Sequence, residues 1–442
     1  MFTIIFCLLA LIAIAGIWIP AGQYARDAAG RVVDGTFAYT PAAARPTGAG
    51  LVFAVLTAPL RGMEAAASIM AFIFVIGGAF KVIENSGAFD AAIRRAVHSL
   101  GRRRILVIPA AMLVFSIGGA VFGMSEEIIP FVILFVPLVR ALGYPPLVGV
   151  AIPLVGAGMG FAGAMINPFT VGIAQAISGL PPLSGWGFRT VSWAVLTVFG
   201  IAFVTLHARR HRIDVEEDAE GGLEKVRFTR AHAAVLFVLV GGIVVMLFGI
   251  QQYEWYVTEI GAVFLAMGLC AGIVSRQHPT QISMGFLEGA KDLLSAALVV
   301  GFARGIVVLA GETFILDTIL YSSSGQLVKL PSVVALQGMF AFQSLLNILV
   351  PSGSGQAALT MPILAPLSEL CGLNRQLAVL AFQFGDGFTN LITPTSAVLM
   401  GALEAGKIPY GTWFRFAWSM QVWLVGIGGV LLGIALAIGY GG

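Results

Sequence analysis

The stretch NILVPSGSGQAALTMPILAPL, residues 347–367, begins as an apolar segment, is interrupted by PSGSGQ and then resumes with two further prolines. Proline removes a backbone donor, and glycine weakens a helix. An unpaired backbone group in hydrocarbon costs several kcal/mol, so irregular backbone at membrane depth persists only where it is buried in protein or lines a cavity. The stretch therefore predicts two helices joined by a polar break that faces a site.

The composition of the whole chain places this break in a membrane. Of 442 residues, 58% are hydrophobic and 11% are charged, and the mean hydropathy is +0.94. Soluble domains carry about 25% charged residues and cannot bury this much apolar surface. We therefore predict an all-α polytopic membrane protein in contact with the lipid bilayer, and we expect no nucleic-acid partner.

Apolar runs long enough to span a membrane recur along the chain. Two further apolar stretches, 105–142 and 331–370, each contain a polar interruption near the middle. We predict that each forms a re-entrant hairpin, meaning a helix pair that enters and leaves on one side. The continuous spans are predicted near 1–22, 63–84, 146–178, 186–206, 232–250, 255–276, 289–311, 375–404 and 412–439.

Clusters of basic residues predict the orientation. The segment NSGAFDAAIRRAVHSLGRRR carries five arginines, and the segment HARRHRIDVEEDAEGGLEKVRFTR carries six basic residues. Lys and Arg are enriched in cytoplasmic loops, whereas acidic residues contribute little to this bias. We expect both loops and the N-terminus in the cytoplasm, with the protein in the inner membrane.

With this orientation the two halves run in opposite directions. Residues 1–206 form a first repeat with hairpin 105–142 and broken span 146–178, and residues 255–442 form a second with hairpin 331–370 and broken span 375–404. Residues 207–254 supply a cytoplasmic linker loop and a connecting span. GMSEEIIPFVILFVPL aligns with SGSGQAALTMPILAPL, and MINPFTVG aligns with LITPTSAV. The pattern predicts an inverted-topology repeat, which is common in secondary transporters.

Each repeat then contributes one hairpin tip and one broken span to a central site. Freed carbonyls and side-chain oxygens suit Na⁺, and half-helix N-termini suit an anionic group. The predicted substrate-binding residues are Ser125, Glu126, Glu127, Asn167, Pro168, Thr170, Arg304, Ser352, Gly353, Ser354, Gln356, Asp386, Asn390, Thr393, Pro394 and Thr395. The predicted Na⁺ ligands are Ser125, Asn167, Ser354, Asn390 and Thr393.

The charged members of this set have alternative roles. Charges within membrane segments are costly and usually functional. Glu126 and Glu127 fit a proton or cation carrier, a counter-charge for a basic substrate, or a cap for the following half-helix. Arg304 fits a partner for a substrate carboxylate or a salt bridge to a scaffold acid. Asp386 lies about two turns before the second break.

The remaining motifs argue against an enzyme. The sequence contains no GxxxxGK[ST] phosphate-binding loop, and its five histidines fall in or beside the predicted cytoplasmic loops. We predict a secondary active transporter, a symporter or antiporter, for a small charged metabolite. It would need no cofactor and would be driven by Na⁺, H⁺ or exchange. An ion channel or ion-only exchanger is the alternative.

The chain resembles the YfcC/DcuC-type carriers of the ion transporter superfamily. The likeness rests on PSGSGQAALTMPILAPL, GDGFTNLITPTSAVLMGALEAGKIPYGTW, GMSEEIIPF, INPFTVGIAQAISGLP and ARGIVV. The resemblance implies a homodimer with a dimerisation scaffold and a transport domain that moves as an elevator.

The resemblance also implies two cation clusters and two substrate classes. The first cluster would consist of Ser125, Asn167 and Thr170. The second would consist of Ser352, Ser354, Asn390, Thr393 and Thr395. The family is described as carrying C4-dicarboxylates or basic amino acids. Dicarboxylate carriers of the superfamily often show Ser-Asn-Thr at the tip, whereas this chain has SEE and SGS. The two tip carboxylates favour a cationic amino acid unless Arg304 compensates or the acids are protonated.

Overall fold

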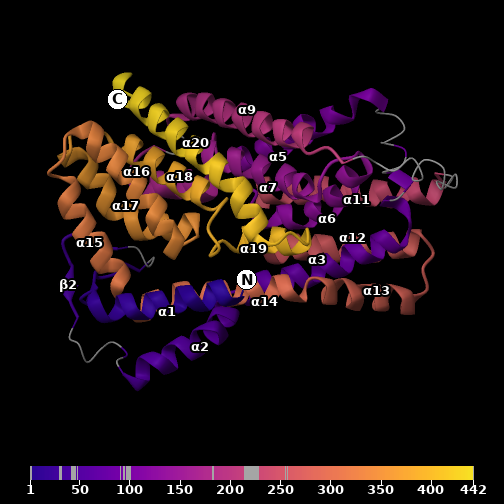
Figure 1. Ribbon diagram of the computed structural model, residues 1–442, viewed down its shortest axis with the longest axis horizontal. Coiled ribbons are helices and arrows are strands. Elements are labelled where there is room, and N and C mark those ends of the chain that lie inside the picture. The colour runs from indigo at the N-terminus through magenta and orange to yellow at the C-terminus, as the bar shows by residue number, and fades with distance from the viewer. Residues whose placement is uncertain are drawn as a thin grey trace.

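The computed structural model describes residues 2–28, 32–40, 46, 48–89, 91–92, 95, 101–181, 184–213, 228–253, 255 and 257–441. It is almost entirely helical (Figure 1). The α-helices are α1 Phe2–Trp18, α2 Ala49–Ala65, α3 Ala67–Asn85, α5 Val107–Phe122, α6 Ile129–Ala141, α7 Pro146–Gly163, α8 Ile173–Ile177, α9 Trp186–Arg210, α11 Arg230–Tyr253, α12 Val257–Val274, α13 Pro279–Asp292, α14 Leu294–Glu312, α15 Ile315–Leu327, α16 Ser332–Leu349, α17 Gly353–Leu370, α18 Arg375–Thr389, α19 Ala397–Ala405 and α20 Tyr410–Ala437. The remaining elements are 3-10 helices η2 Gly101–Leu106 and η3 Glu126–Ile128, the π-helical turn η4 Pro168–Gly172, and strands β1 Gly22–Gln23 and β2 Ala38–Tyr39.

Many of these helices are long enough to span a membrane. Within the described residues, seven are long and apolar enough to cross a bilayer, and α13 with α14 makes an eighth if that bent pair is one span. The prediction of a polytopic helical membrane protein is therefore confirmed at the level of fold class. The acidic part of the linker loop, residues 214–227, lies outside the described residues.

Three helices, α2, α13 and α15, have no counterpart in the predicted spans. The predicted spans 63–84 and 289–311 each run across a helix break in the structure. The break at Ala66 separates α2 from α3, and the break at Leu293 separates α13 from α14. All three helices contain charged or hydroxyl side chains, so none of them shows in the sequence as a long apolar run. A helix that packs against other helices needs only a narrow apolar stripe on one face.

The helices around these two breaks pack closely through glycine. α2 packs on α14, where a Cβ on Gly62 would overlap the backbone of Gly305. α3 packs on α13, where a Cβ on Gly77 would overlap the carbonyl of Gly289. Small residues allow helix backbones to approach in this way within a membrane. These four helices and α1, α12 form a layer along one side of the molecule (Figure 1).

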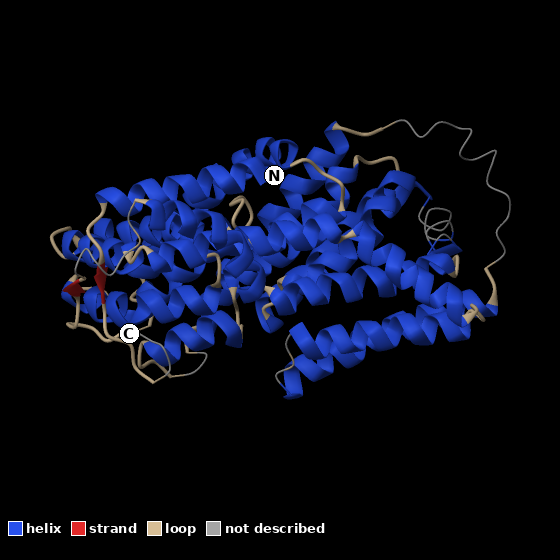
Figure 2. Ribbon diagram, turned by 90° about the horizontal axis from the view of Figure 1, so that it is seen from below, coloured by secondary structure: helices blue, strands red, loops and turns tan. Residues whose placement is uncertain are grey.

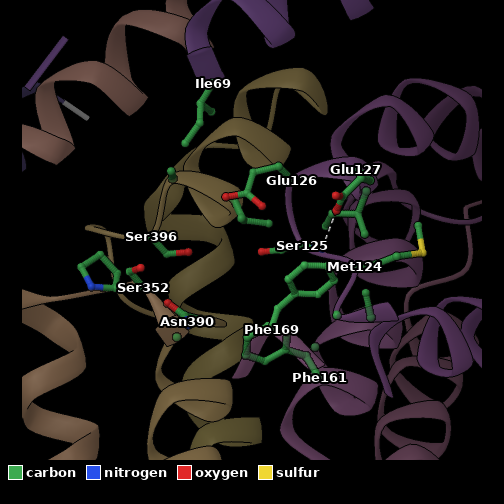
Figure 3. A pocket seen from close by; sticks show the side chains of 18 of the residues that line it. Ile69, Met124, Ser125, Glu126, Glu127, Phe161, Phe169, Ser352, Asn390 and Ser396 are labelled. Carbon is green, nitrogen blue, oxygen red and sulfur yellow. Dashed lines mark hydrogen bonds between the residues drawn. The ribbon is translucent and has the colours of Figure 1, made fainter. Parts of the chain in front are cut away.

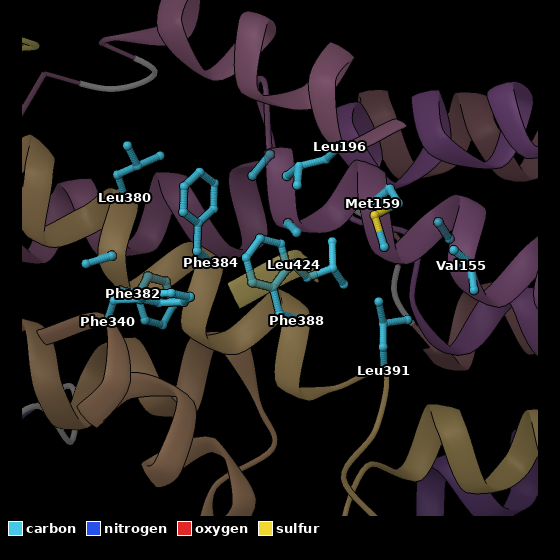
Figure 4. Close-up of a cluster of buried hydrophobic side chains, with 14 of the residues drawn as sticks. Val155, Met159, Leu196, Phe340, Leu380, Phe382, Phe384, Phe388, Leu391 and Leu424 are labelled. Atoms are coloured by element: carbon cyan, nitrogen blue, oxygen red, sulfur yellow. The ribbon is translucent and has the colours of Figure 1, made fainter. Parts of the chain in front are cut away.

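A second and larger body surrounds α7 and α18. α7 packs against α5, α6 and α9, and α18 packs against α16, α17 and α20. The two groups are in contact, because α18 packs on α7, where a Cβ on Gly387 would overlap Ala162. Within the α18 group, Phe384 and Phe388 stack with ring centroids 5.4 Å apart, and Phe340 of α16 meets both edge-on (Figure 4).

The short strands lie at the same end of the molecule as the C-terminus (Figure 2). Gly22 pairs with Tyr39 and Gln23 with Ala38 in antiparallel register. The hairpin is tied to α15, because Asp317 accepts the backbone N–H of Tyr24 at 2.9 Å and pairs with Arg26 at 2.8 Å.

Candidate functional site

The helix breaks meet at one cavity of about 240 Å³. Figure 3 shows the polar side chains of Ser125, Glu126, Ser352, Asn390 and Ser396 directed toward a common space from opposite sides. Both halves of the chain therefore contribute polar groups to it. We call this the central cavity.

The first side of the cavity is the turn between α5 and η3. α5 ends at Gly123, which has φ 67° and therefore favours glycine. Ser125 is the N-cap of η3, and its backbone N–H donates to Oε2 of Glu127 at 2.7 Å. Glu127 thus acts as a capping carboxylate, whereas Glu126 projects into the cavity (Figure 3).

The opposite side is the turn between α16 and α17. Ser352 is the N-cap of α17, where its hydroxyl accepts the N–H of Gly355 at 3.3 Å. Pro351, Ser352, Gly353 and Ser354 all line the cavity. The backbone donors in the first turn of α17 are therefore presented to the cavity, with the positive end of the helix dipole.

The break between α7 and α8 approaches from the first half. Ala164 closes α7 with φ 38°, and Asn167 caps η4 by accepting the N–H of Phe169 at 2.9 Å. Thr170 in η4 lines the cavity and touches Gly353 of α17. This contact joins a break in one half directly to a tip in the other.

The break between α18 and α19 approaches from the second half. Asn390 follows α18 and donates to Oδ1 of Asp386 at 2.8 Å. The Thr393 and Thr395 hydroxyls are hydrogen-bonded at 2.7 Å. Ser396 caps α19 by accepting the N–H of Leu399 at 3.3 Å. The N-terminus of α19 therefore also faces the cavity, through Ser396 and its neighbour Ala397.

Charge in and around the cavity is unbalanced toward the negative. Glu126 and Glu127 line it, and Arg304 of α14 is the one basic side chain in its described lining. Asp386 is fully buried immediately behind Gly353, where a Cβ on the glycine would lie 2.9 Å from Oδ2.

The structure gathers most, but not all, of the predicted residues at the cavity surface. The residues that line it are Ser125, Glu126, Glu127, Thr170, Arg304, Ser352, Gly353, Ser354, Asn390 and Thr395. The predicted residues outside the lining are Asn167, Pro168, Gln356, Asp386, Thr393 and Pro394. Gln356 points away, because its amide donates to the side chain and backbone carbonyls of Gln343 at 2.6 and 2.9 Å.

Several lining residues were not predicted from the sequence. Ser396 could have been, because a serine directly before an apolar run is an N-cap signal. The aromatic wall of Phe122, Phe161, Phe169 and Trp255 could not, because apolar side chains in a hydrophobic chain give no local signal of facing a cavity.

Several buried oxygen atoms near the cavity are candidate ligands for a cation. In the described part of the chain, Thr170 Oγ1, Asp386 Oδ2, Thr389 Oγ1 and Asn390 Oδ1 are buried without a hydrogen-bond partner. Oxygen atoms of this kind suit a hard monovalent cation. No group of three His, Cys, Asp or Glu residues that could hold a metal occurs within the described residues. These oxygen ligands therefore fit Na⁺ better than a transition metal.

A buried arginine holds the α7 break in place. The guanidinium of Arg189, fully buried, donates to the Ala164 carbonyl at 3.1 Å, the Ser184 carbonyl at 2.8 Å and the Tyr440 hydroxyl at 3.1 Å. The carbonyl of Ala164 is one that the end of α7 leaves without a helical partner. Arg189 therefore links the broken span to the C-terminal segment.

Replacing Arg189 with alanine is expected to lower the melting temperature of the purified protein markedly. The change leaves buried carbonyls without donors, at about 1–3 kcal/mol each. Tyr440→Phe removes only the two hydrogen bonds of the hydroxyl group, with Arg189 and with the Gly185 carbonyl, and should cause a much smaller shift. Equal melting temperatures for wild type and Arg189→Ala in detergent would contradict this role.

Helix breaks that converge on one cavity, within a bundle of membrane-length helices, are typical of a membrane transporter. The sequence family agrees. The family model described as DcuC, C4-dicarboxylate anaerobic carrier, matches residues 1–437, and the chain belongs to this family. Because this is a family of carriers, the predictions of the family and of a protein that is not an enzyme are confirmed.

Two relatives are similar over most of this chain. The chain is 40% identical over 372 residues to the Escherichia coli (strain K12) protein named "Putative basic amino acid antiporter YfcC", covering 79% of this chain and 74% of that one. It is 29% identical over 394 residues to an uncharacterized protein of Haemophilus influenzae, covering 86% and 77%.

Two solved structures are distantly similar. The Alcanivorax borkumensis YdaH transporter has a TM-score of 0.42 and 16% identity, with 99% of this chain and 97% of that one covered. Neisseria gonorrhoeae MtrF, from a class of antimetabolite efflux pumps, has a TM-score of 0.46 and 18% identity, with 97% and 94% covered.

Proposed function

We propose that this protein is a secondary active transporter of a basic amino acid across the cytoplasmic membrane, working by exchange or driven by Na⁺ or H⁺. The observation that carries the proposal is the charge of the central cavity. Glu126 and Glu127 outnumber Arg304 in its lining, and Asp386 lies directly behind Gly353.

A substrate with a net positive charge would be attracted to this cavity. Carboxylates in a water-poor site interact strongly with an ammonium or guanidinium group. Glu126 is the group best placed for this contact, because its carboxylate projects into the cavity (Figure 3). A dicarboxylate dianion would need more than one cationic partner, and the described lining offers only Arg304.

The α-carboxylate of an amino acid has a separate place to bind. The N-termini of α17 and α19 face the cavity, with Ser352 and Ser396 as their caps. Helix N-termini present backbone donors and the positive end of the dipole, which together favour an anionic group. Arg304 would add to the attraction.

The aromatic wall suits the rest of such a substrate. Phe122, Phe161, Phe169 and Trp255 line the cavity together. An aromatic face attracts an organic cation and also packs on a methylene chain. The wall would therefore accept the stem and the cationic end of lysine, ornithine or arginine.

In the proposed transport cycle a transport domain moves as an elevator against a scaffold, and both are built from two inverted repeats. The scaffold helices support the repeat beyond the motifs at the tips: with the breaks at Ala66 and Leu293 aligned, Gly62 falls on Gly289. Ala66 has φ −107° and ψ 10°, and Leu293 has φ −103° and ψ 8°. The packing is reciprocal as well, with α2 on α14 and α13 on α3. The inner-membrane orientation with a cytoplasmic N-terminus, and the homodimer, belong to the same proposal.

Asp386 is the group we assign to the coupling ion. Its Oδ1 accepts from Asn390, while Oδ2 is buried with no partner in the described residues, beside the orphaned oxygens of Thr389 and Asn390. A carboxylate in this setting can take up a proton or hold Na⁺ with neighbouring oxygens. Asp386→Asn should therefore abolish any dependence of substrate binding on Na⁺ or on pH.

A thermal-shift screen of the purified protein tests the proposal. Arginine, ornithine, succinate and malate are each added in Na⁺ and in choline buffer. A ligand that binds the folded state raises the melting temperature by mass action, equivalent to about 2.7 kcal/mol at 100 times Kd. Stabilisation by arginine or ornithine is expected, and a requirement for Na⁺ would identify the coupling ion. Stabilisation by succinate or malate alone would overturn the substrate assignment.

A further inference from the structure

A second cavity of about 370 Å³ lies away from the central cavity, beside the β1–β2 hairpin and α15. Its described lining includes Tyr24, Asp34, Phe37 and Tyr321 on one side. Ile363 and Leu367, from the later part of α17, form the opposite wall. We call this the outer pocket, because it adjoins the loop that the basic-residue pattern places outside.

The aromatic side of the outer pocket is tightly built. Phe37 stacks on Tyr321 with ring centroids 4.1 Å apart and planes 6° apart, and Tyr24 packs on Phe37 at 5.2 Å. Burial raises the pKa of Tyr24, so its ring remains a neutral phenol. The Tyr24 backbone is in turn fixed by its hydrogen bond to Asp317 at 2.9 Å. The rings are therefore held in place before any ligand arrives.

The charges around the pocket leave one carboxylate available. Arg26 and Asp317 neutralise one another in an ion pair of 2.8 Å. Asp34 accepts the N–H of Gly35 at 2.8 Å through Oδ1 and has no ion pair with any described residue. The described lining contains no lysine or arginine. Asp34 is therefore the charged side chain that the described lining presents to a ligand, and it would attract a cation.

A carboxylate beside aromatic rings recognises guanidinium and ammonium groups, and an apolar wall accommodates a methylene stem. We propose that the outer pocket is a second binding site, separate from the central cavity, for alkyl guanidinium or alkyl ammonium compounds. The proposal rests on the proposed function only in that a transported basic amino acid would be the natural ligand.

The position of the pocket on α17 gives the site a role. The first turn of α17 lines the central cavity, and Leu367 lines the outer pocket. At 1.5 Å per residue, these positions are about 20 Å apart along one helix. A cation in the outer pocket would bridge α17 and α15, and would concentrate substrate near the central cavity before it enters.

Agmatine distinguishes the two sites, because it has the guanidinium and stem of arginine but no carboxylate for the helix N-termini. Calorimetric titration of the purified protein is expected to show agmatine binding. Asp34→Asn and Tyr321→Leu should each weaken it about tenfold, the size expected for losing one charge-assisted or cation–π contact. Glu288→Gln, at an exposed residue of α13 that pairs with Lys81 and lines neither cavity, should leave agmatine binding unchanged. Unaltered melting temperatures without ligand show that the variants remain folded.

The outcomes separate this inference from the proposed function. Agmatine binding that responds to Glu126→Gln but not to the Asp34 or Tyr321 variants overturns the outer site, as does the absence of agmatine binding to the wild type. If agmatine binds in the outer pocket while arginine does not bind centrally, the outer site stands and the proposed function fails.

Discussion

Replacing Gly353 with valine is expected to reduce substrate uptake into proteoliposomes to the background of empty liposomes. Gly353 is the first residue of α17, at the point where the two halves of the chain meet. A Cβ there would lie 2.5 Å from Cγ2 of Thr170 and 2.9 Å from Oδ2 of Asp386, both shorter than ordinary contacts. Because valine adds two further methyl groups, either the tip or the η4 break must move away from the cavity.

A matched control and a rescue make this test specific. A Cβ added to Gly426 in α20 would meet no atom within 4 Å, so Gly426→Val should leave uptake unchanged. Gly353→Ala should lose much of the activity, and adding Thr170→Ser should restore part of it, since serine lacks Cγ2. Full uptake by Gly353→Val, with normal amounts in the membrane, would show that the contact between the tip and η4 is not required.

The location of the site could be predicted from the sequence because its physical cause is local. Proline, glycine and serine can interrupt an apolar membrane segment only where protein or water satisfies the freed backbone groups. The residues at these interruptions, such as Ser125, Ser354 and Asn390, do line the central cavity. The inversion of the two halves and their motion stay predictions.

The direction of individual side chains could not be predicted in the same way. Asn167 and Gln356 have the right chemistry and nearly the right position, yet both are buried outside the cavity lining. Their directions follow from the backbone around each break, including the positive φ angles of Gly123 and Ala164. Those angles depend on packing between distant helices, and residue type alone does not determine them.

Some of the scaffold was also beyond sequence reasoning. α2 contains Arg61 and Glu64, so its apolar run ends at Leu60 and is too short to span a bilayer. Its place is set by contact with α14, where Arg61 pairs with Glu312 and Gly62 meets Gly305. Such a helix becomes recognisable only once its partner is known, because its stabilisation comes from close backbone contact more than from hydrophobicity.

Replacing Glu126 with glutamine is expected to raise the KM for arginine about 10- to 100-fold. Glutamine keeps the shape of the side chain and removes its charge. A hydrogen bond to a charged group is worth about 1.5–3 kcal/mol, and each 1.4 kcal/mol changes affinity tenfold. The Glu126 carboxylate projects into the cavity, so loss of its charge should act mainly on binding (Figure 3).

The substrate dependence of this variant separates the two candidate substrate classes. Glu126 and Arg304 both line the cavity, so removing the carboxylate leaves the cavity more positive. A carrier of basic amino acids should lose arginine uptake, whereas a dicarboxylate carrier should keep or gain succinate uptake. Glu369→Gln is a suitable control, because Glu369 is about half exposed and pairs with Arg375 at 2.8 Å, outside the cavity lining. Unchanged arginine kinetics in Glu126→Gln would mean that the cationic group binds elsewhere, and the charge of the central cavity could then no longer identify the substrate.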